Sequence, residues 1–408
     1  MARMQLDRVN RFLLRKQHLV PETRGDDVVQ VVHDICALHS TAPLTPYLSL
    51  WSRVKGFEPE QLDKELYESR ELVRVTCMRA TLHIVPSERL SSFFQATKKR
   101  QRRGLRQMGY LLVQSGLCRA GEEEPTVQRL LERIAAVVAQ RGPSTVAELS
   151  ERVPELAAKF QYAPDKPYGG EFSVGSQLVP WMCVLGLLVR TKPRGSWRSN
   201  LYEYAPLAAW LPDVDLEAIA PAEAQVRLVR WYLAAFGPAT PEDIAWWSGF
   251  SKGETKKALS ALGDEALEVE TERLGGGYLM LAADRDGLRH TQVGTEPVVN
   301  LLPSLDPYIM GYRDRRRFLG PEHYDQVFDR AGNAFATVWI NGKVVGIWRE
   351  QGATIELLVW EDIENEALLA EAERLGRFLI GPGVQAVVKP YPPDLYVKNP
   401  FALARRRR

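Results

Sequence analysis

The chain has 408 residues, 45% of them hydrophobic and 25% charged, with a formal net charge of +2 at pH 7, which is typical of a globular protein of three or four domains. No apolar run approaches the roughly 20 residues that span a bilayer, and charges interrupt residues 1–20, which excludes a transmembrane protein and a secretory signal. The cysteines at 36, 77, 118 and 183 match no zinc-ligand spacing. We therefore expect a cytoplasmic protein without structural zinc or a disulfide framework.

The N-terminal segment is predicted to begin with three helices and to end in a pair of strands. Apolar periodicity indicates helices around 5–16, 27–39 and 58–68. Residues 71–86, ELVRVTCMRATLHIVP, then have the alternating pattern of two paired strands. Three helices followed by a hairpin is the element order of a winged helix, so we expect a diverged copy of that module here.

A strongly basic segment follows this module. Residues 1–110 contain 19 lysines and arginines against 12 acidic residues, so the rest of the chain is net acidic. Six cations without an intervening acid lie within residues 90–109: Lys98, Lys99, Arg100, Arg102, Arg103 and Arg106. Such a run is often only a solvated helix face, but its self-repulsion favours a polyanionic partner. We predict that it binds phosphate groups.

Residues 127–149 and 226–248 form a weak internal repeat. In each copy an amphipathic helix ends at Gly-Pro, and a threonine just after the proline can cap a second helix. Both copies continue into a further helix and two strands, joined by a basic turn in the first copy and by the glycines at 275–277 in the second. The glycine-rich turn lacks the strand, loop and helix order of a nucleotide site. We therefore predict two further winged-helix modules and no nucleotide cofactor.

The character of the chain changes after residue 297. ATVWINGKVVGIW alternates on both sides of Asn341-Gly342, a strong hairpin signal because both turn positions need a positive φ. Strands at 353–360 and 384–389 flank a helical pattern at 363–379, and a basic tail, 405–408, ends the chain. We expect an α+β protein with modules at 1–118, 119–208 and 209–296, and a C-terminal β-barrel-like domain at 297–408.

Four sequence blocks together resemble the AlkZ/YcaQ-like winged-helix DNA glycosylases. They occur in the family's order and extend over most of the chain: LHSTAPLTPYLSLWSRV (38–54), MRATLHIVP (78–86), FGPATPEDIAWWSG (236–249) and LLPSLDPYIMGYRDRRRFL (301–319). The resemblance implies tandem winged helices, a C-terminal barrel-like domain and a DNA-binding cleft. It also implies excision of alkylated purines and, in some members, the unhooking of interstrand crosslinks.

The family's catalytic signature, Gln, any residue, then Gln or Asp, falls on His39-Ser40-Thr41 in this chain. An N3- or N7-alkylated purine is already cationic and leaves readily, so positioning of the attacking water dominates catalysis. A neutral His39 can accept a hydrogen bond or proton from that water, and the Thr41 hydroxyl can accept a second. Because a free imidazole titrates at about pH 6.5, we expect activity to fall as the pH drops. A cap on a helix end is the structural alternative for His39.

The resemblance also suggests contacts with DNA. Arg79, Thr81 and His83 share the second block. The alternative for His83 is a satisfied strand residue, and the alternative for Arg79 is packing of its side-chain stem. In the fourth block, Asp306 is a minor catalytic candidate, because a carboxylate stabilises a cationic transition state; a structural hydrogen bond or an arginine pair is its other possible role. The remaining candidates for phosphate contact are arginines of the fourth block: Arg313, Arg315, Arg316 and Arg317.

The sequence thus predicts a monofunctional DNA glycosylase that acts on alkylated purines in double-stranded DNA. We expect a monomer associated with the nucleoid, without metal ion or organic cofactor. The main alternative is a non-catalytic winged-helix regulator or damage sensor, which the His-Ser-Thr variant of the signature favours. A self-resistance protein against a DNA-alkylating compound is a third hypothesis.

Overall fold

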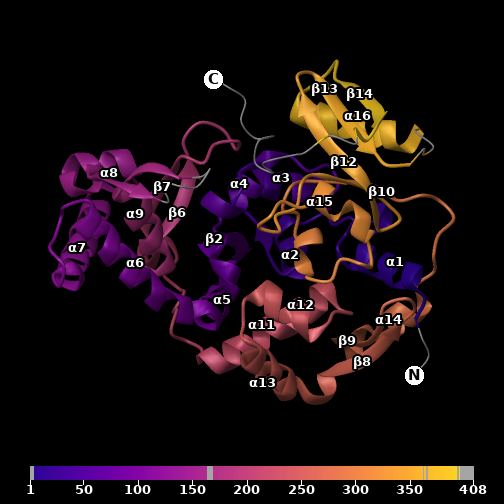
Figure 1. Ribbon diagram of the computed structural model, residues 1–408, viewed down its shortest axis with the longest axis horizontal. Helices are drawn as coiled ribbons and strands as arrows, with labels where there is room; N and C mark the ends of the chain where they lie inside the picture. Colours follow the sequence, from indigo (N-terminus) through magenta and orange to yellow (C-terminus); the bar gives the residue numbers. More distant parts are fainter. Residues whose placement is uncertain (1–3, 163–168, 362, 364–365, 393–394, 396–408) are drawn as a thin grey trace. The chain divides into compact units, whose positions relative to one another are not determined.

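The computed structural model describes residues 4–162, 169–361, 363, 366–392 and 395, and the side chains of residues 100–103 lie outside this set. The chain forms two compact units, one of residues 1–62 and 225–408 and the other of residues 63–224 (Figure 1). Both units mix helices and strands, as the sequence predicted. Among the described residues, no helix is long and apolar enough to cross a membrane. The basic tail lies outside the described part of the chain.

The unit of residues 63–224 begins with the predicted pair of strands. β2 (Leu72–Thr76) and β3 (Leu82–Pro86) are antiparallel. At their turn Arg79 and Ala80 both have a positive φ, 50° and 58°, and the Thr81 amide donates to the Met78 carbonyl at 3.0 Å. Two helices follow, with a short 3-10 turn between them: α5 (Leu90–Thr97) and α6 (Gln101–Gln114).

The first copy of the internal repeat has the predicted order of elements. Its helices are α7 (Glu123–Arg141), α8 (Val146–Arg152) and α9 (Gly175–Val184). A hairpin of β6 (Leu188–Pro193) and β7 (Tyr202–Pro206) completes it. Thr145 caps α8 as predicted, in a capping box with Glu148. Three elements accompany this copy: β4 (Lys159–Tyr162), β5 (Gly170–Ser173) and α10 (Leu207–Trp210).

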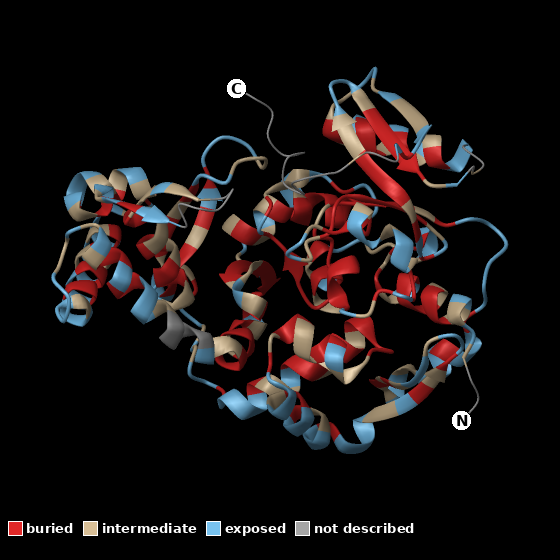
Figure 2. Ribbon diagram, viewed as in Figure 1, coloured by how far each residue is buried: buried red, intermediate tan, exposed pale blue. Residues whose placement is uncertain are grey.

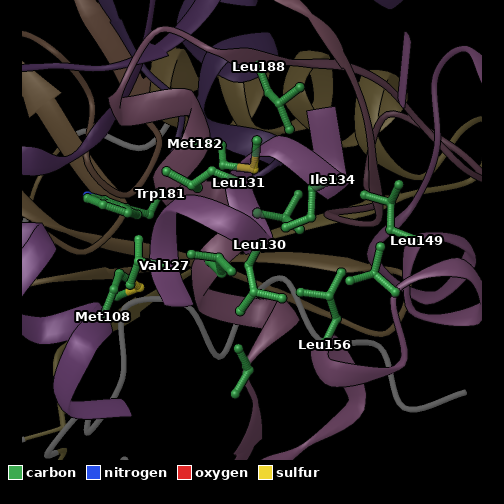
Figure 3. Close-up of a cluster of buried hydrophobic side chains, with 14 of the residues drawn as sticks. Met108, Val127, Leu130, Leu131, Ile134, Leu149, Leu156, Trp181, Met182 and Leu188 are labelled. Carbon is green, nitrogen blue, oxygen red and sulfur yellow. The ribbon is translucent and has the colours of Figure 1, made fainter. Parts of the chain in front are cut away.

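An apolar core holds this copy together. Its side chains come from α6, α7, α8, α9, β6 and the 3-10 turn after α8, and Figure 3 shows them pointing toward one another: Met108, Val127, Leu130, Leu131, Ile134, Leu149, Leu156, Trp181, Met182 and Leu188. Four of these side chains lie on one face of α7: Val127, Leu130, Leu131 and Ile134. Burial of that face fixes the orientation of the helix.

The unit of residues 1–62 and 225–408 begins with the N-terminal helices. α1 (Leu6–Lys16) agrees with the prediction, whereas α2 (Val28–Asp34) ends five residues before the predicted boundary. The chain turns at Cys36, which has a φ of 72°, and continues as the short strand β1 (Leu38–His39). The next helix, α3 (Leu44–Trp51), was not predicted from the sequence, whereas α4 (Pro59–Tyr67) was.

The second copy of the repeat has the same element order as the first. Its helices are α11 (Pro221–Phe236), α12 (Pro241–Ser248) and α13 (Lys252–Leu262). The hairpin consists of β8 (Ala266–Thr271) and β9 (Gly275–Leu281), and α14 (Arg285–His290) follows. Thr240 caps α12 through a capping box with Asp243, as the repeat predicted. Figure 2 shows exposed residues along much of α13.

The C-terminal region is an open sheet in which the strands follow their chain order. Asn341 and Gly342 have positive φ values, 51° and 78°, and form the predicted turn between β11 (Thr337–Ile340) and β12 (Lys343–Gln351). The other elements are β10 (Val299–Leu302), α15 (Tyr324–Val327), β13 (Thr354–Val359), α16 (Glu366–Leu379) and β14 (Gln385–Pro390). In the described residues β10 and β14 are the two edges, so the expected barrel does not close. β14 runs parallel to β13 because α16 returns the chain to the same end of the sheet.

Candidate functional site

The segment of the predicted catalytic signature lies between β1 and α3. His39 is buried, with 4% of its surface exposed, whereas Thr41 is exposed. The backbone N–H of Thr41 donates to Nδ1 of His39 at 3.4 Å. Nδ1 can accept this bond only in a ring that carries no proton on that nitrogen. His39 lies in the short strand β1, five residues after the last residue of α2.

The helix that follows this segment is anchored by the block at 301–319. α3 begins directly after Pro43, and the Thr45 hydroxyl donates to the carbonyl of Ser304 at 2.8 Å. One turn later, the Ser49 hydroxyl donates to Oδ2 of Asp306 at 2.9 Å. These bonds join residues more than 250 positions apart in sequence, and they fix the start of α3 and with it the end of the signature segment.

Asp306 is wholly buried and paired with Arg53, which is buried as well. The two arginine amino groups donate to the two carboxylate oxygens at 2.7 and 2.8 Å. The Tyr308 amide donates to Oδ1 at 2.9 Å. Together with Ser49, these partners give each oxygen two hydrogen bonds. This is the structural role that the sequence left open for Asp306, and a carboxylate enclosed in this way has no access to a substrate. The sequence reasoning missed Arg53, because nothing local distinguishes it from a solvated arginine.

The four arginines of the same block divide into two pairs. Arg315 and Arg317 are 7% and 2% exposed, so neither is available to a phosphate. The Arg315 guanidinium lies 3.6 Å from the Phe328 ring centroid, and that of Arg317 lies 4.3 Å from the Tyr312 ring centroid. Burial lowers the pKa of Arg315. Arg313 and Arg316 are exposed, and Asp314 raises the pKa of Arg316 through an ion pair at 2.7 Å.

The predicted DNA contacts of the second block lie in the other unit, on the hairpin of β2 and β3. His83 is buried, its Nδ1 lies 3.1 Å from the Thr81 carbonyl oxygen, and burial lowers its pKa to about 3. The Thr81 hydroxyl donates to the Met78 carbonyl at 2.9 Å. The burial of His83 agrees with its alternative role as a satisfied strand residue, while Thr81 is half-buried. Arg79, at the turn, is half-buried.

The basic segment lies in the same unit, at the end of α5 and along α6. Lys98 pairs with Glu217 at 2.6 Å, and this hydrogen bond lowers the pKa of the glutamate. Lys99 and Arg106 are exposed. Three of the predicted phosphate contacts have side chains outside the described set: Arg100, Arg102 and Arg103. Glu217 offsets the charge of Lys98.

A family model described as DNA glycosylase AlkZ-like matches residues 32–378, most of the chain. The chain belongs to this family. A relative, the interstrand DNA cross-link repair glycosylase of Streptomyces sahachiroi, is 25% identical over 376 residues, 89% of this chain and 94% of that protein. The solved structure of Streptomyces sahachiroi DNA glycosylase AlkZ has the same fold, with a TM-score of 0.71 and 21% identity, and the match covers 95% of this chain and 100% of that one. The protein is therefore a DNA glycosylase that acts in DNA repair, as the four sequence blocks indicated.

Proposed function

We propose that the protein hydrolyses the N-glycosidic bond of alkylated purines in double-stranded DNA, with His39 and Thr41 holding the attacking water. The observation that carries the proposal is the family match over residues 32–378. It is supported by the geometry of the signature segment, where the exposed Thr41 donates its backbone N–H to Nδ1 of the buried His39 at 3.4 Å. Reactions of this kind need neither a metal ion nor an organic cofactor.

The assignment of winged helices to the two repeat copies forms part of this proposal. Both copies have three helices followed by a hairpin. In both, the residue just before the capping threonine pairs with a strand of that hairpin. Ser144 bridges Tyr204, and Ala239 bridges Leu279, each through two backbone hydrogen bonds of 2.7–3.1 Å. Such a short third strand beside the hairpin agrees with a winged-helix module, and it recurs at the same place in each copy.

The chemistry follows from the charge of the substrate. An alkylated purine departs as a neutral base, so the enzyme needs no strong general acid. What remains is to place a water below C1′ and to avoid adding positive charge next to an oxocarbenium-like sugar. A neutral His39 meets both requirements, and the exposed hydroxyl of Thr41 supplies a second hydrogen bond to the water.

We infer that the DNA backbone is held by exposed cations. The candidates that stay accessible in the described residues are Lys99, Arg106, Arg313 and Arg316, with the half-buried Arg79 as a fifth. Each neutralised phosphate contributes about 0.9 to the slope of log affinity against log salt concentration. Substitution of Lys99 and Arg106 by glutamate should therefore make the salt slope clearly less steep.

An interstrand crosslink is a second candidate substrate. The relative from Streptomyces sahachiroi is named for crosslink repair and aligns with 89% of this chain. Such a lesion is a pair of alkylated purines joined through one linker, so unhooking it needs the same bond cleavage. We further infer a monomer that works on the nucleoid.

The test is an assay for base release. The protein is incubated with a duplex that carries one 7-methylguanine, and alkali then converts abasic sites into strand breaks. We expect breaks with the wild type and with His290→Ala, which changes an exposed histidine, and far fewer with His39→Ala. Tight binding of the damaged duplex without any abasic site would favour the non-catalytic regulator or sensor. A duplex with a defined purine crosslink distinguishes the second substrate.

A further inference from the structure

α3, the helix directly after the signature segment, is enclosed on every side. Residues 45–51 are all buried, and Pro43, at the N-cap position, has no side chain that could cap the helix. A helix that exposes one face is oriented by the burial of the other, but a helix enclosed all round has no such preference. The rotation of α3 and its position along its own axis must therefore come from directional contacts.

Three polar side chains supply these contacts from one side of α3 and of the turn that continues it. They follow one another at intervals of four residues, which places them in a row, and we call them the polar row: Thr45, Ser49 and Arg53. The Thr45 hydroxyl donates to the Ser304 carbonyl at 2.8 Å. Ser49 and Arg53 donate to the Asp306 carboxylate at 2.7–2.9 Å. The whole row thus meets one short segment of the chain.

The segment that receives the polar row has an unusual backbone conformation. Leu305, between Ser304 and Asp306, has a φ of 60°, in the left-handed region that residues other than glycine rarely adopt. Its amide donates to the Ala334 carbonyl at 3.1 Å, and the Asp306 amide donates to the Pro303 carbonyl at 3.2 Å. Such a conformation persists only where the surroundings fix it. Here the carbonyl before Leu305 and the carboxylate after it both face the same helix.

We propose that Thr45 is a positioning residue for the glycosylase reaction, because its bond to Ser304 sets where α3 begins. Thr45 is only 1% exposed, so it does not touch the substrate itself. Only residues 40–43 lie between β1 and α3, and a shift of the helix is therefore passed on to His39 and Thr41. The proposal rests on the proposed function, since it takes those two residues as the groups that hold the water.

Single-turnover release of 7-methylguanine, with binding of the damaged duplex measured separately, tests the proposal. Thr45→Val keeps the shape of the side chain and removes its hydroxyl. We expect it to lower the rate of base release by roughly 10–100-fold, because misplacement of a reacting group by about 1 Å has an effect of this size. Its affinity for the duplex should stay close to that of the wild type, since Thr45 is buried. Thr45→Ser keeps the hydroxyl and should retain most of the wild-type rate.

Ser52→Ala is the matched control, because it removes another buried hydroxyl at the end of the same helix. The Ser52 hydroxyl donates to the Leu48 carbonyl at 3.1 Å, so this bond does not join α3 to residues 301–319. The control should leave the rate unchanged. Ser49→Ala removes the next contact of the polar row and should lower the rate less than Thr45→Val, since it lies one turn further from the signature segment.

Combination with His39→Ala separates a positioning role from a merely structural one. If Thr45 acts by aiming the groups that hold the water, its substitution should cost much less once the imidazole is gone. The double variant should then be nearly as slow as His39→Ala alone. A general loss of folded protein would instead lower the rate by the same factor in both backgrounds.

The outcomes separate this proposal from the proposed function. A wild-type protein that releases no 7-methylguanine overturns the proposed function, and the role of Thr45 falls with it. If the wild type releases the base and Thr45→Val keeps the full rate, only the positioning role is wrong; Ser49→Ala decides in the same way if Thr45→Val does not fold. Equal losses with and without His39, or a Ser52→Ala variant as slow as Thr45→Val, also overturn it. Urea unfolding of every variant ensures that rates are compared between folded proteins.

Discussion

Residues 38–54 and residues 301–319 are both rich in polar side chains, but the structure uses them in different ways. In the first block, an exposed Thr41 stands beside a buried His39 whose Nδ1 accepts only as a neutral ring. In the second block, Asp306 and two of the four arginines are buried among partners from distant parts of the chain. The Arg53–Asp306 pair connects the two blocks. The comparison suggests that one block carries the chemistry and the other holds it in place.

Removal of the Asp306 carboxylate should have the largest effect on stability. Asp306→Ala leaves the Arg53 guanidinium buried without its counter-charge, and we expect a loss of about 3–5 kcal/mol in the free energy of unfolding. Urea denaturation measures it. The combined variant Arg53→Met with Asp306→Leu should recover much of this loss, because no unpaired charge remains. If Asp306→Asn instead abolished base release with an unchanged unfolding midpoint, Asp306 would belong to the catalytic machinery.

Substitution of His39 should have the largest effect on activity. Groups that position or activate a nucleophilic water typically contribute 10²–10⁴-fold, so we expect His39→Ala to lower single-turnover base release by about 100-fold or more. Thr41→Ala should cost roughly 10-fold, since it removes one hydrogen bond to the water. Both rates are compared with those of His290→Ala. If His39→Ala kept an activity close to that of the wild type, His39 would have no catalytic role.

The same two blocks show what could be predicted from the sequence. Local signals were sufficient for the turn at Asn341-Gly342 and for the threonine caps of α8 and α12, because each depends on residues a few positions apart. The blocks also identified the family. The pairing of Arg53 with Asp306 was out of reach, since it joins residues 253 positions apart and neither partner has a local signature.

Two further differences have the same physical origin. Four of the five residues 313–317 are arginines and resemble one basic patch, yet Arg315 is buried against Phe328, and Arg317 against Tyr312 of its own block and Tyr278 of β9. The C-terminal strands were found, but their closure depends on which edges pair, and β10 and β14 stay apart in the described sheet. In each case the missing information was tertiary.

The dependence on pH sharpens the assignment of His39. A protonated ring cannot accept the Thr41 amide bond and adds positive charge near the sugar, so base release should fall as the pH drops, up to about tenfold per unit below the titration. His83 cannot cause this fall, because burial lowers its pKa to about 3 and it stays neutral in the folded protein. Single-turnover rates from pH 5.5 to 8 measure the effect, and His39→Gln should give a flat profile.

Stability has its own dependence on pH, which must be measured separately. The unfolded chain takes up a proton on His83 near the ordinary value of 6.5, whereas the folded protein does so only at about 3. The unfolded state therefore binds more protons between these values, and folding stability should decrease as the pH falls through that window. Urea midpoints at each pH show whether the enzyme is still folded where its activity is assayed.

The smallest effects should come from the exposed arginines of the second block, and they test the division of that block directly. Arg313→Ala and Arg316→Ala should each make the salt slope of duplex binding less steep by at most about 0.9, with the unfolding midpoint unchanged. Arg316 should contribute less than Arg313, because Asp314 already pairs with it. Arg317→Ala should do the reverse: it removes a guanidinium packed on Tyr312 and should destabilise the fold while leaving the slope unaltered. A lower slope for Arg317→Ala at full stability would mean that the buried pair opens toward DNA, and the contrast between the two blocks would then fail.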